Sequence, residues 1–408
     1  MSTSVRPWLH RPYLRSSRRT WLVVGVVLAA LAAALVVDLV VLTPSRRAPT
    51  PTARFVTRND LASEIDGLVI GTARTTPGAT AYVSWPGNYW VGAAGVANVT
   101  TGAAIRPDAR MRLESISKDF LATIVLQLTQ EGKLRVSDTV AKWLPGLLPN
   151  GGKITVRELM TDRSGLIDDN DLLRSGAAAR GYLVRVKDSK LRAQLAAIAH
   201  RWDVNPALEV SPIWLIRFAA WQPLLFTPGS RYHHSNIGWN ILGMIAARAA
   251  GKPLPELYRE RIFEPLGLKH TAYNPQGPIA GPHANGYAIS PNGKLTDETA
   301  WHFGKGPDGA IVSDAQDTAT FFTALMQGRL LDRQQLDAMK GADFWLGGEH
   351  SCAGGPVAYG GTGEGDAYTS EVIVNGNGTS IAVLLMNARS PFGLQTADAT
   401  VVNLYCAA

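Results

Sequence analysis

Hydrophobic positions recur with helical spacing in a segment that follows residue 115. They stand at i, i+3, i+4 and i+7, at Leu121, Ile124, Val125 and Leu128. This spacing is typical of a helix with one buried face, and Gly132 follows where such a helix commonly ends. The pattern predicts a helix whose first turn contains Ser115 and Lys118. A second helix is predicted over residues 237–250, and Gly251 provides its end.

Strand-like runs occur in two pairs, one near each end of the chain. Residues 79–85 and 89–96 are separated by a Pro-Gly-Asn turn, which is a hairpin signal. Residues 371–374 and 380–386 form a second pair, with an Asn-Gly turn after the first strand. We therefore expect two antiparallel hairpins.

An apolar stretch from Trp21 to Leu42 is interrupted by a single charge, Asp38. At ~1.5 Å per residue it is long enough to cross a ~30 Å hydrocarbon core. Five arginines precede it, and the arginine-rich side of such a segment stays in the cytoplasm. We predict a cytoplasmic basic tail at residues 1–20 and a transmembrane anchor, or uncleaved signal, at residues 21–43. A cleaved signal peptide is the alternative, because small residues within the stretch resemble cleavage sites.

Residues 44–54 contain prolines, threonines and arginines and are predicted to form a linker. The main domain is then expected over residues 55–408, with Asn59 and Asp60 as candidate caps of its first helix. The net charge of +7 does not indicate a nucleic-acid partner, because residues 1–58 carry nine arginines and one acid. The rest of the chain is close to neutral and lacks the basic footprint that nucleic acid requires.

Candidate chemistry begins with Ser115 and Lys118, three residues apart. Residues at this spacing share one helix face, so the Lys118 amine can reach the Ser115 oxygen. A partly desolvated ammonium gives up its proton more readily and can then act as a base. The pair is therefore a candidate nucleophile with its base. A Ser-x-x-Lys pair also arises by chance in a chain of this length, so its surroundings carry the argument.

From Met111 to Pro145 the chain resembles the serine β-lactamase and penicillin-binding protein superfamily. The resemblance is to the class C β-lactamase and D-alanyl-D-alanine carboxypeptidase-like branch, and it covers roughly residues 59–405. Residues 155–166 are similar to a family segment that usually reads Leu-Leu-Thr-His-x-Ser-Gly-Leu, with Asp162 in place of the histidine. That segment is mainly structural in the family, so we expect the replacement to have a modest effect.

The second family motif is Tyr-x-Asn, and His234-Ser235-Asn236 stands at its place. The family tyrosine shuttles a proton, and histidine can do so near neutrality because its unperturbed pKa is ~6.5. The resemblance thus implies a catalytic set of Ser115, Lys118, His234 and Asn236, with Asn236 bonded to Lys118 and the substrate. The alternative is that His234 only fills space in a site that has lost its chemistry.

The third family motif is Lys-Thr-Gly or His-x-Gly, on a strand that edges the site. One register places Gly361-Thr362-Gly363 there, and another places Tyr359 at the position of the histidine. The residues alone do not decide between the two registers. In either case the resemblance implies substrate-binding roles for Tyr359 and residues 361–363 and an oxyanion hole of backbone N–H groups. These would come from Ser115 and the strand at residues 362–364.

The fold implied by the resemblance is an α/β, β-lactamase-like domain. Its antiparallel sheet is built from both ends of the chain and flanked by helices, beside a mostly helical region, and one N-terminal transmembrane helix precedes it. Residues 167–225 look long for this position, and their tryptophans, Trp202, Trp214 and Trp221, could form a lid or could pack in a core.

The resemblance further implies a serine hydrolase at the bacterial cell membrane, single-pass, with its catalytic domain on the periplasmic or extracellular side. Its substrates would be cell-wall peptides, β-lactams or other small molecules such as esters. The alternative is a catalytically impaired module that binds cell-wall peptides or a protein partner. No cofactor is expected.

Two cysteines, Cys352 and Cys406, are present in a chain expected to be exported. They could form a disulfide that closes a loop of about 55 residues and contributes roughly 4 kcal/mol. Two unpaired thiols are the alternative, because the sequence gives no geometry. The eight histidines form no ligand-like cluster with cysteines or carboxylates, so no metal site is predicted.

Overall fold

The computed structural model describes residues 58–70, 76–169, 184–190, 192–193, 196, 211–290, 292–300, 306–341, 346, 352, 355, 357–389 and 393–407. The predicted tail, anchor and linker therefore lie outside the described residues, as does most of the predicted lid segment with Trp202. Among the described residues, we find no helix that combines the length and apolar character needed to span a bilayer.

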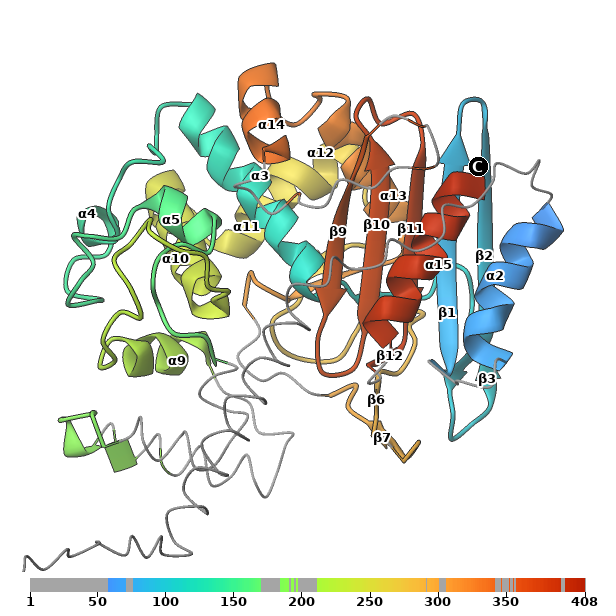
Figure 1. The fold of residues 1–408 in the computed structure, drawn as a ribbon, viewed down its shortest axis with the longest axis horizontal. Helices are drawn as coiled ribbons and strands as arrows, with labels where there is room; N and C mark the ends of the chain where they lie inside the picture. Colours follow the sequence, from blue (N-terminus) through green and yellow to red (C-terminus); the bar gives the residue numbers. More distant parts are fainter. Residues whose placement is uncertain are drawn as a thin grey trace, which may run out of the picture. The chain divides into compact units, whose positions relative to one another are not determined.

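A six-stranded sheet brings together the two ends of the described chain (Figure 1). Its strand order is β3-β2-β1-β11-β10-β9, and neighbouring strands are antiparallel. The strands are β1 Gly78–Trp85, β2 Asn88–Asn98, β3 Ala103–Ala104, β9 Ala358–Glu364, β10 Thr369–Asn375 and β11 Ile381–Met386. The central pairing joins β1 to β11, which confirms the expectation of a sheet built from both ends.

Both predicted hairpins are present. Trp85 pairs with Asn88 across the first turn, where Gly87 adopts a positive φ of 81°. The second hairpin has a longer loop than the Asn-Gly signal suggests, because Val374 pairs with Ile381 and the positive φ falls on Gly378. Alternation along β1 sends Ala81 and Val83 to one face of the sheet, with Tyr82 on the other.

Helices cover both faces of this sheet. Helices α2 Arg58–Ile70 and α15 Gly393–Ala407 lie side by side on one face (Figure 1). The other face is covered by α13 Ala315–Met326 and α3 Ser117–Gln130, with the 3-10 turn η1 Glu114–Ile116 leading into α3. The predicted helix after Ser115 is confirmed, and Gly132 ends it at a positive φ of 69°.

A mostly helical region adjoins α3 (Figure 1). It contains α4 Val140–Trp143, α5 Val156–Met160, α9 Pro212–Ala219, α10 Asn236–Ala250, α11 Leu254–Tyr258, the π-helical turn η2 Arg259–Phe263 and α12 Glu264–Leu266. Helix α10 ends at Gly251 as predicted, and α10 packs against α3, α5 and α9. Trp214 of α9 packs against the core of this region, while Trp221 is partly exposed.

The remaining elements are short. Helix α14 is Arg333–Lys340, and two three-stranded sheets have the orders β12-β6-β7 and β4-β8-β5. Their strands are β4 Met111–Arg112, β5 Ala272–Tyr273, β6 Tyr287–Ile289, β7 Leu295–Asp297, β8 Ile311–Ser313 and β12 Ala388–Arg389. Strand β4 pairs with β8 directly before η1, which anchors the chain that carries Ser115.

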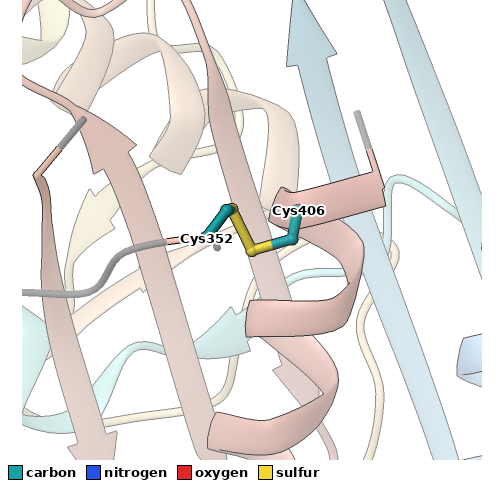
Figure 2. The surroundings of a disulfide bond; sticks show 2 residues. All are labelled: Cys352 and Cys406. Carbon is teal, nitrogen blue, oxygen red and sulfur yellow. A yellow bond between two sulfur atoms is a disulfide. The ribbon is translucent and has the colours of Figure 1, made fainter. Parts of the chain in front are cut away.

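Cys352 and Cys406 form a disulfide, which ties α15 to the segment before β9 (Figure 2). Of the two alternatives that the sequence left open, the structure shows the disulfide. Because α15 packs on β10 and β11, this bond links the segment before β9 to the layer behind the sheet.

Candidate active site

Ser115 lies in η1, in the segment Leu113 to Lys118 that we call the nucleophile turn. The Lys118 Nζ atom donates to Ser115 Oγ at 2.7 Å. Lys118 is fully buried at 0 % exposure, while Ser115 is partly exposed. The helix spacing therefore produces the predicted contact between a reachable hydroxyl and a buried amine.

Backbone and side-chain contacts from two other elements, β8 and β10, hold the nucleophile turn. Leu113 N donates to Ile311 O of β8, and Ser370 Oγ of β10 donates to Leu113 O. Two residues after the nucleophile, at the start of α3, Ser117 Oγ accepts from Ile311 N. Glu114 adopts a positive φ of 48°, which the surrounding contacts must stabilise.

Strand β9 passes directly over the nucleophile turn. A Cβ atom added to Gly363 would lie 2.1 Å from Leu113 O and 3.1 Å from Ser115 N, so only glycine fits here. A Cβ atom on Gly361 would lie 3.1 Å from Asp119 Oδ2 of α3. Gly363 therefore faces the nucleophile turn and Gly361 faces α3, as expected for the register that places Gly361, Thr362 and Gly363 in the third motif.

The other two predicted substrate-binding side chains lie elsewhere. Thr362 Oγ1 donates to Glu371 Oε2 at 2.8 Å, and Glu371 interacts electrostatically with Asp398 of α15, so the Thr362 side chain faces the α15 layer. Tyr359 pairs with Val374 at the opposite end of β9, where its ring lies 5.4 Å from Lys340 Nζ. Only the backbone of Thr362 is placed to meet a substrate beside Gly363.

The second motif begins just before α10, where Ser235 caps the helix. His234 Nδ1 lies 3.1 Å from Asp168 Oδ2, and Asn236 N donates to Asp168 Oδ1 at 2.9 Å. The Asn236 side chain donates to Asp169 Oδ1 at 3.0 Å, a contact that the sequence did not predict. His234 and Asn236 are therefore held by carboxylates of a segment about 66 residues earlier in the chain.

We call residues 162–169 the acidic segment, because it places Asp162, Asp168 and Asp169 in buried positions beside the second motif. Burial raises the pKa of Asp162, and the charges of His234 and Lys118 oppose that rise. Burial and the neighbouring Asp168 raise the pKa of Asp169 well above its ordinary range. Asp162 thus interacts electrostatically with both the Lys118 and the His234 side chains.

We expected the replacement of the family histidine by Asp162 to have a modest effect. In the structure, Asp162 makes several contacts beside the second motif. Its Oδ1 atom accepts from Trp239 Nε1 at 3.1 Å and from Ser235 N at 3.4 Å, and its backbone oxygen accepts from His233 N. Sequence reasoning missed Asp168 and Asp169 altogether. Two adjacent acids directly after the apolar Leu166-Ile167 were a signal, since carboxylates in an apolar context are commonly paired or functional.

Asp119, next to Lys118, is a further buried acid of this site. Neither of its carboxyl oxygens has a hydrogen-bond partner among the described residues. Burial raises its pKa well above the ordinary range, and Lys118 opposes that rise. Among the residues that the structure describes, no group of three or more His, Cys, Asp or Glu side chains could hold a metal ion.

Residues 61–407 match the family model described as Beta-lactamase. The chain is 27% identical over 234 residues to the esterase EstB of Burkholderia gladioli, covering 55% of this chain and 54% of that protein. It is 28% identical over 239 residues to a putative D-alanyl-D-alanine carboxypeptidase of Salmonella schwarzengrund, covering 53% of this chain and 50% of that protein. The chain thus matches about half the length of these curated relatives.

Solved structures support the same fold. A D-stereospecific amidohydrolase from a Streptomyces species superposes with a TM-score of 0.68 at 24% identity, covering 86% of this chain and 98% of that one. A D-amino acid amidase from Ochrobactrum anthropi SV3 gives a TM-score of 0.66 at 23% identity, with 85% and 96% covered. A penicillin-binding protein homologue from Pyrococcus abyssi gives 0.65 at 20% identity, with 85% and 76% covered.

Proposed function

This chain belongs to the beta-lactamase family of hydrolases, and we propose that it acts through an acyl-enzyme formed on Ser115. The observation that carries the proposal is the 2.7 Å contact between the buried Lys118 Nζ and Ser115 Oγ. In this proposal, Lys118 takes the proton of Ser115 as the serine oxygen attacks the substrate carbonyl. The leaving group departs with a proton, and the acyl group stays on Ser115.

The oxyanion of this step needs two backbone donors. We assign one to Ser115 N and the other to an N–H of residues 362–364, because the Gly363 position lies against Ser115 N. Backbone donors require no particular side chain, so this part of the site tolerates the altered third motif. His234 and Asn236 would complete the site on its other side.

We propose that the substrates are uncharged esters or amides rather than carboxylate-bearing β-lactams or D-Ala-D-Ala peptides. A Lys or His at the first position of the third motif would bind such a carboxylate, and Gly361 has no side chain to do so. Arg389 could serve instead, but it lies 3.5 Å from Glu364 and 4.0 Å from Asp366. The buried acids of the acidic segment further disfavour an anionic group.

The names of the relatives agree with this substrate class in part. An esterase and a putative D-alanyl-D-alanine carboxypeptidase are among the relatives, and an amidohydrolase and an amidase are among the structures of like fold. Ester, amide and lactam hydrolysis share the acylation step, so one nucleophile can serve them all. The choice among them depends on the leaving group and its surroundings.

Labelling tests the nucleophile. A fluorescent fluorophosphonate should form a phosphonyl adduct on the wild-type protein, seen by intact-mass spectrometry, and Ser115→Ala should abolish it. Ser290→Ala is the matched control, because Ser290 lies in the exposed turn between β6 and β7. Labelling that persists in Ser115→Ala would refute the assignment. A wild-type protein that is neither labelled nor able to hydrolyse esters would favour the alternative, a binding module without catalysis.

We also propose that the protein is exported and anchored by residues 21–43, with the basic tail in the cytoplasm. Protease added to intact spheroplasts should then remove the catalytic domain and leave a small membrane-bound stub. A catalytic domain that is protected until lysis would contradict this topology. A domain found free in the medium would indicate a cleaved signal peptide instead.

A further inference from the structure

Asp168 contacts both His234 and Asn236 of the second motif. One carboxylate oxygen accepts from Asn236 N, and the other lies 3.1 Å from His234 Nδ1. Asp168 is only 5 % exposed, whereas the His234 side chain is 33 % exposed. A buried carboxylate therefore holds an imidazole that can still meet a substrate or water.

We propose that Asp168 is a positioning residue that sets the tautomer and orientation of His234, so that His234 Nε2 acts as the base of deacylation. The inference rests on the proposed acyl-enzyme function and extends it to a residue outside the family motifs quoted above. In this proposal a histidine–carboxylate pair takes the role of the family tyrosine.

The donor and acceptor inventory determines the tautomer. An ionised carboxylate can only accept hydrogen bonds, so the Nδ1 atom facing Asp168 must carry the hydrogen. In a neutral imidazole the Nε2 atom is then left with its lone pair. We take Asp168 as the ionised member of this acidic pair, because burial and the neighbouring Asp168 raise the pKa of Asp169 well above its ordinary range.

Other contacts restrict His234 in the same way. Ser235 Oγ donates to Ile167 O at 3.0 Å, so the residue after His234 is tied to the residue before Asp168. His233 N donates to Asp162 O at 2.8 Å on the other side of His234. His233 and all three residues of the second motif are thus bound to the acidic segment. These contacts fix the backbone from which the imidazole projects.

Asp162 lies within electrostatic reach of both His234 and Lys118. Its buried carboxyl interacts electrostatically with both side chains. Lys118 Nζ is hydrogen-bonded to Ser115 Oγ. The two bases can therefore serve different steps of the reaction. Lys118 would serve acylation and His234 would serve the attack of water.

In the proposed deacylation, water attacks the acyl-enzyme. A water oxygen bonds to the acyl carbon, and its proton passes to His234 Nε2. Asp168 stabilises the imidazolium that forms, as the buried aspartate does in serine-protease triads. The tetrahedral intermediate then collapses, the bond from the acyl carbon to Ser115 Oγ breaks, and Ser115 takes the proton from His234 as the acid product leaves.

Asp168→Asn tests this role with little change of shape. Its remaining oxygen can still accept from Asn236 N, but its amide would donate toward His234 Nδ1 and favour the tautomer with hydrogen on Nε2. We expect a fall in kcat for an uncharged p-nitrophenyl ester of about 10²- to 10⁴-fold, by analogy with the same substitution in protease triads. kcat/KM should change by only a few-fold, because it reports acylation, in which Asp168 has no part, and KM should therefore fall together with kcat.

The matched control is Asp314→Asn. Asp314 is 3 % exposed, contacts His270 Nδ1 and caps α13, so it offers the same kind of His–Asp pair away from the second motif. This variant should keep its turnover within about twofold, since neither residue is part of the proposed machinery. An equal loss in both variants would show that any buried aspartate of this type matters only for stability, and would overturn the inference.

Two further readouts separate positioning from a structural role. In a His234→Phe background, Asp168→Asn should lower kcat by less than a further factor of about two. The effects of residues that act through one another are not additive. A full second loss would overturn the inference. Nitrogen-15 NMR of the histidine rings in the wild-type protein should show hydrogen on His234 Nδ1, and hydrogen on Nε2 would also overturn it, even if the variant fails to fold.

Failure of the proposed function would look different. Fluorophosphonate labelling of Ser115 should persist in Asp168→Asn, and a slowly hydrolysed ester should accumulate as acyl-enzyme on it. Labelling in both proteins with equal turnover would defeat the role of Asp168 alone. No labelling of the wild-type protein would defeat the acyl-enzyme proposal, while the tautomer measurement would still decide how Asp168 holds His234.

Discussion

The nucleophile turn and the acidic segment lie on two sides of the same site but are held in different ways. The nucleophile turn depends on backbone groups: Leu113 bonds to β8 and β10, and Gly363 of β9 lies against the Ser115 amide. The acidic segment holds its partners through side chains, with Asp168 and Asp169 bound to His234 and Asn236. Contacts made by backbone groups persist when most side chains are replaced. A contact between two side chains is kept only when both residues change together.

This difference explains where the chain departs from its family. Ser115 and Lys118 remain in their expected places, and β9 passes over them although its motif carries only glycine at the first position. The second motif instead carries His234 in place of tyrosine, and His234 meets Asp168. In the proposed reaction the two departures are of different kinds: one removes a cation, and the other replaces one proton carrier by another.

Gly363→Ala should break the nucleophile side most severely. The added Cβ would lie 2.1 Å from Leu113 O and 2.4 Å from Ser370 Oγ, so β9 must move away from the Ser115 amide. Loss of one oxyanion donor typically lowers kcat by about 10²- to 10³-fold. Acylation rates from stopped-flow burst kinetics would measure the loss. Gly152→Ala is the control, since nothing lies within 4 Å of its added Cβ; wild-type acylation in Gly363→Ala would show that β9 does not serve the oxyanion.

His234→Phe should affect the other side of the site and a different step. Without a proton acceptor, deacylation should slow by roughly 10²-fold, a typical contribution of general acid–base catalysis, and acylation should slow less. The acyl-enzyme should then accumulate, which intact-mass spectrometry would detect. His270→Phe is the control, because His270 makes a similar contact with Asp314. Unchanged burst and steady-state rates would make His234 a spacer.

The missing cation of the third motif predicts substrate choice. A charge-assisted hydrogen bond to a carboxylate is worth roughly 1.5–3 kcal/mol, or a ten- to hundredfold effect. A penicillin should therefore have a kcat/KM well below that of an uncharged p-nitrophenyl ester. Gly361→Lys would place a cation close to Asp119 and should narrow the difference if it folds. Efficient penicillin turnover with negligible esterase activity in the wild-type protein would contradict this account of the site.

Glu371 offers a smaller test, because it lies behind β9 and accepts from Thr362. Burial raises its pKa from 4.5 to about 8, so the folded protein holds a proton that the unfolded chain releases between these values. Stability should therefore fall as pH rises from 4.5 to about 8, by at most ~1.4 kcal/mol per pH unit from this group. Urea unfolding across this range would measure the slope, which Glu371→Gln should reduce. An unchanged slope in that variant would show that Glu371 is ionised in the folded state.

The sequence by itself determined the parts of the protein that depend on near neighbours. The periodicity of α3, the stop at Gly132 and the contact of Lys118 with Ser115 all arise within a few turns of one helix, where spacing sets geometry. The first hairpin also followed from local alternation and a glycine turn. Resemblance to the family supplied the expectation of one antiparallel sheet built from both ends of the chain, which local patterns do not contain.

Only the tertiary structure decided the pairing register of β9 and the contacts of the acidic segment with the second motif. A run of glycines carries no alternation from which to choose a register, so the choice required the pairing with β10 and the contact with Ser115 N. Asp168 and His234 are 66 residues apart, and nothing in either neighbourhood encodes their approach. The raised pKa of Asp169 depends on burial and on Asp168 together, so it exists only after the chain has folded.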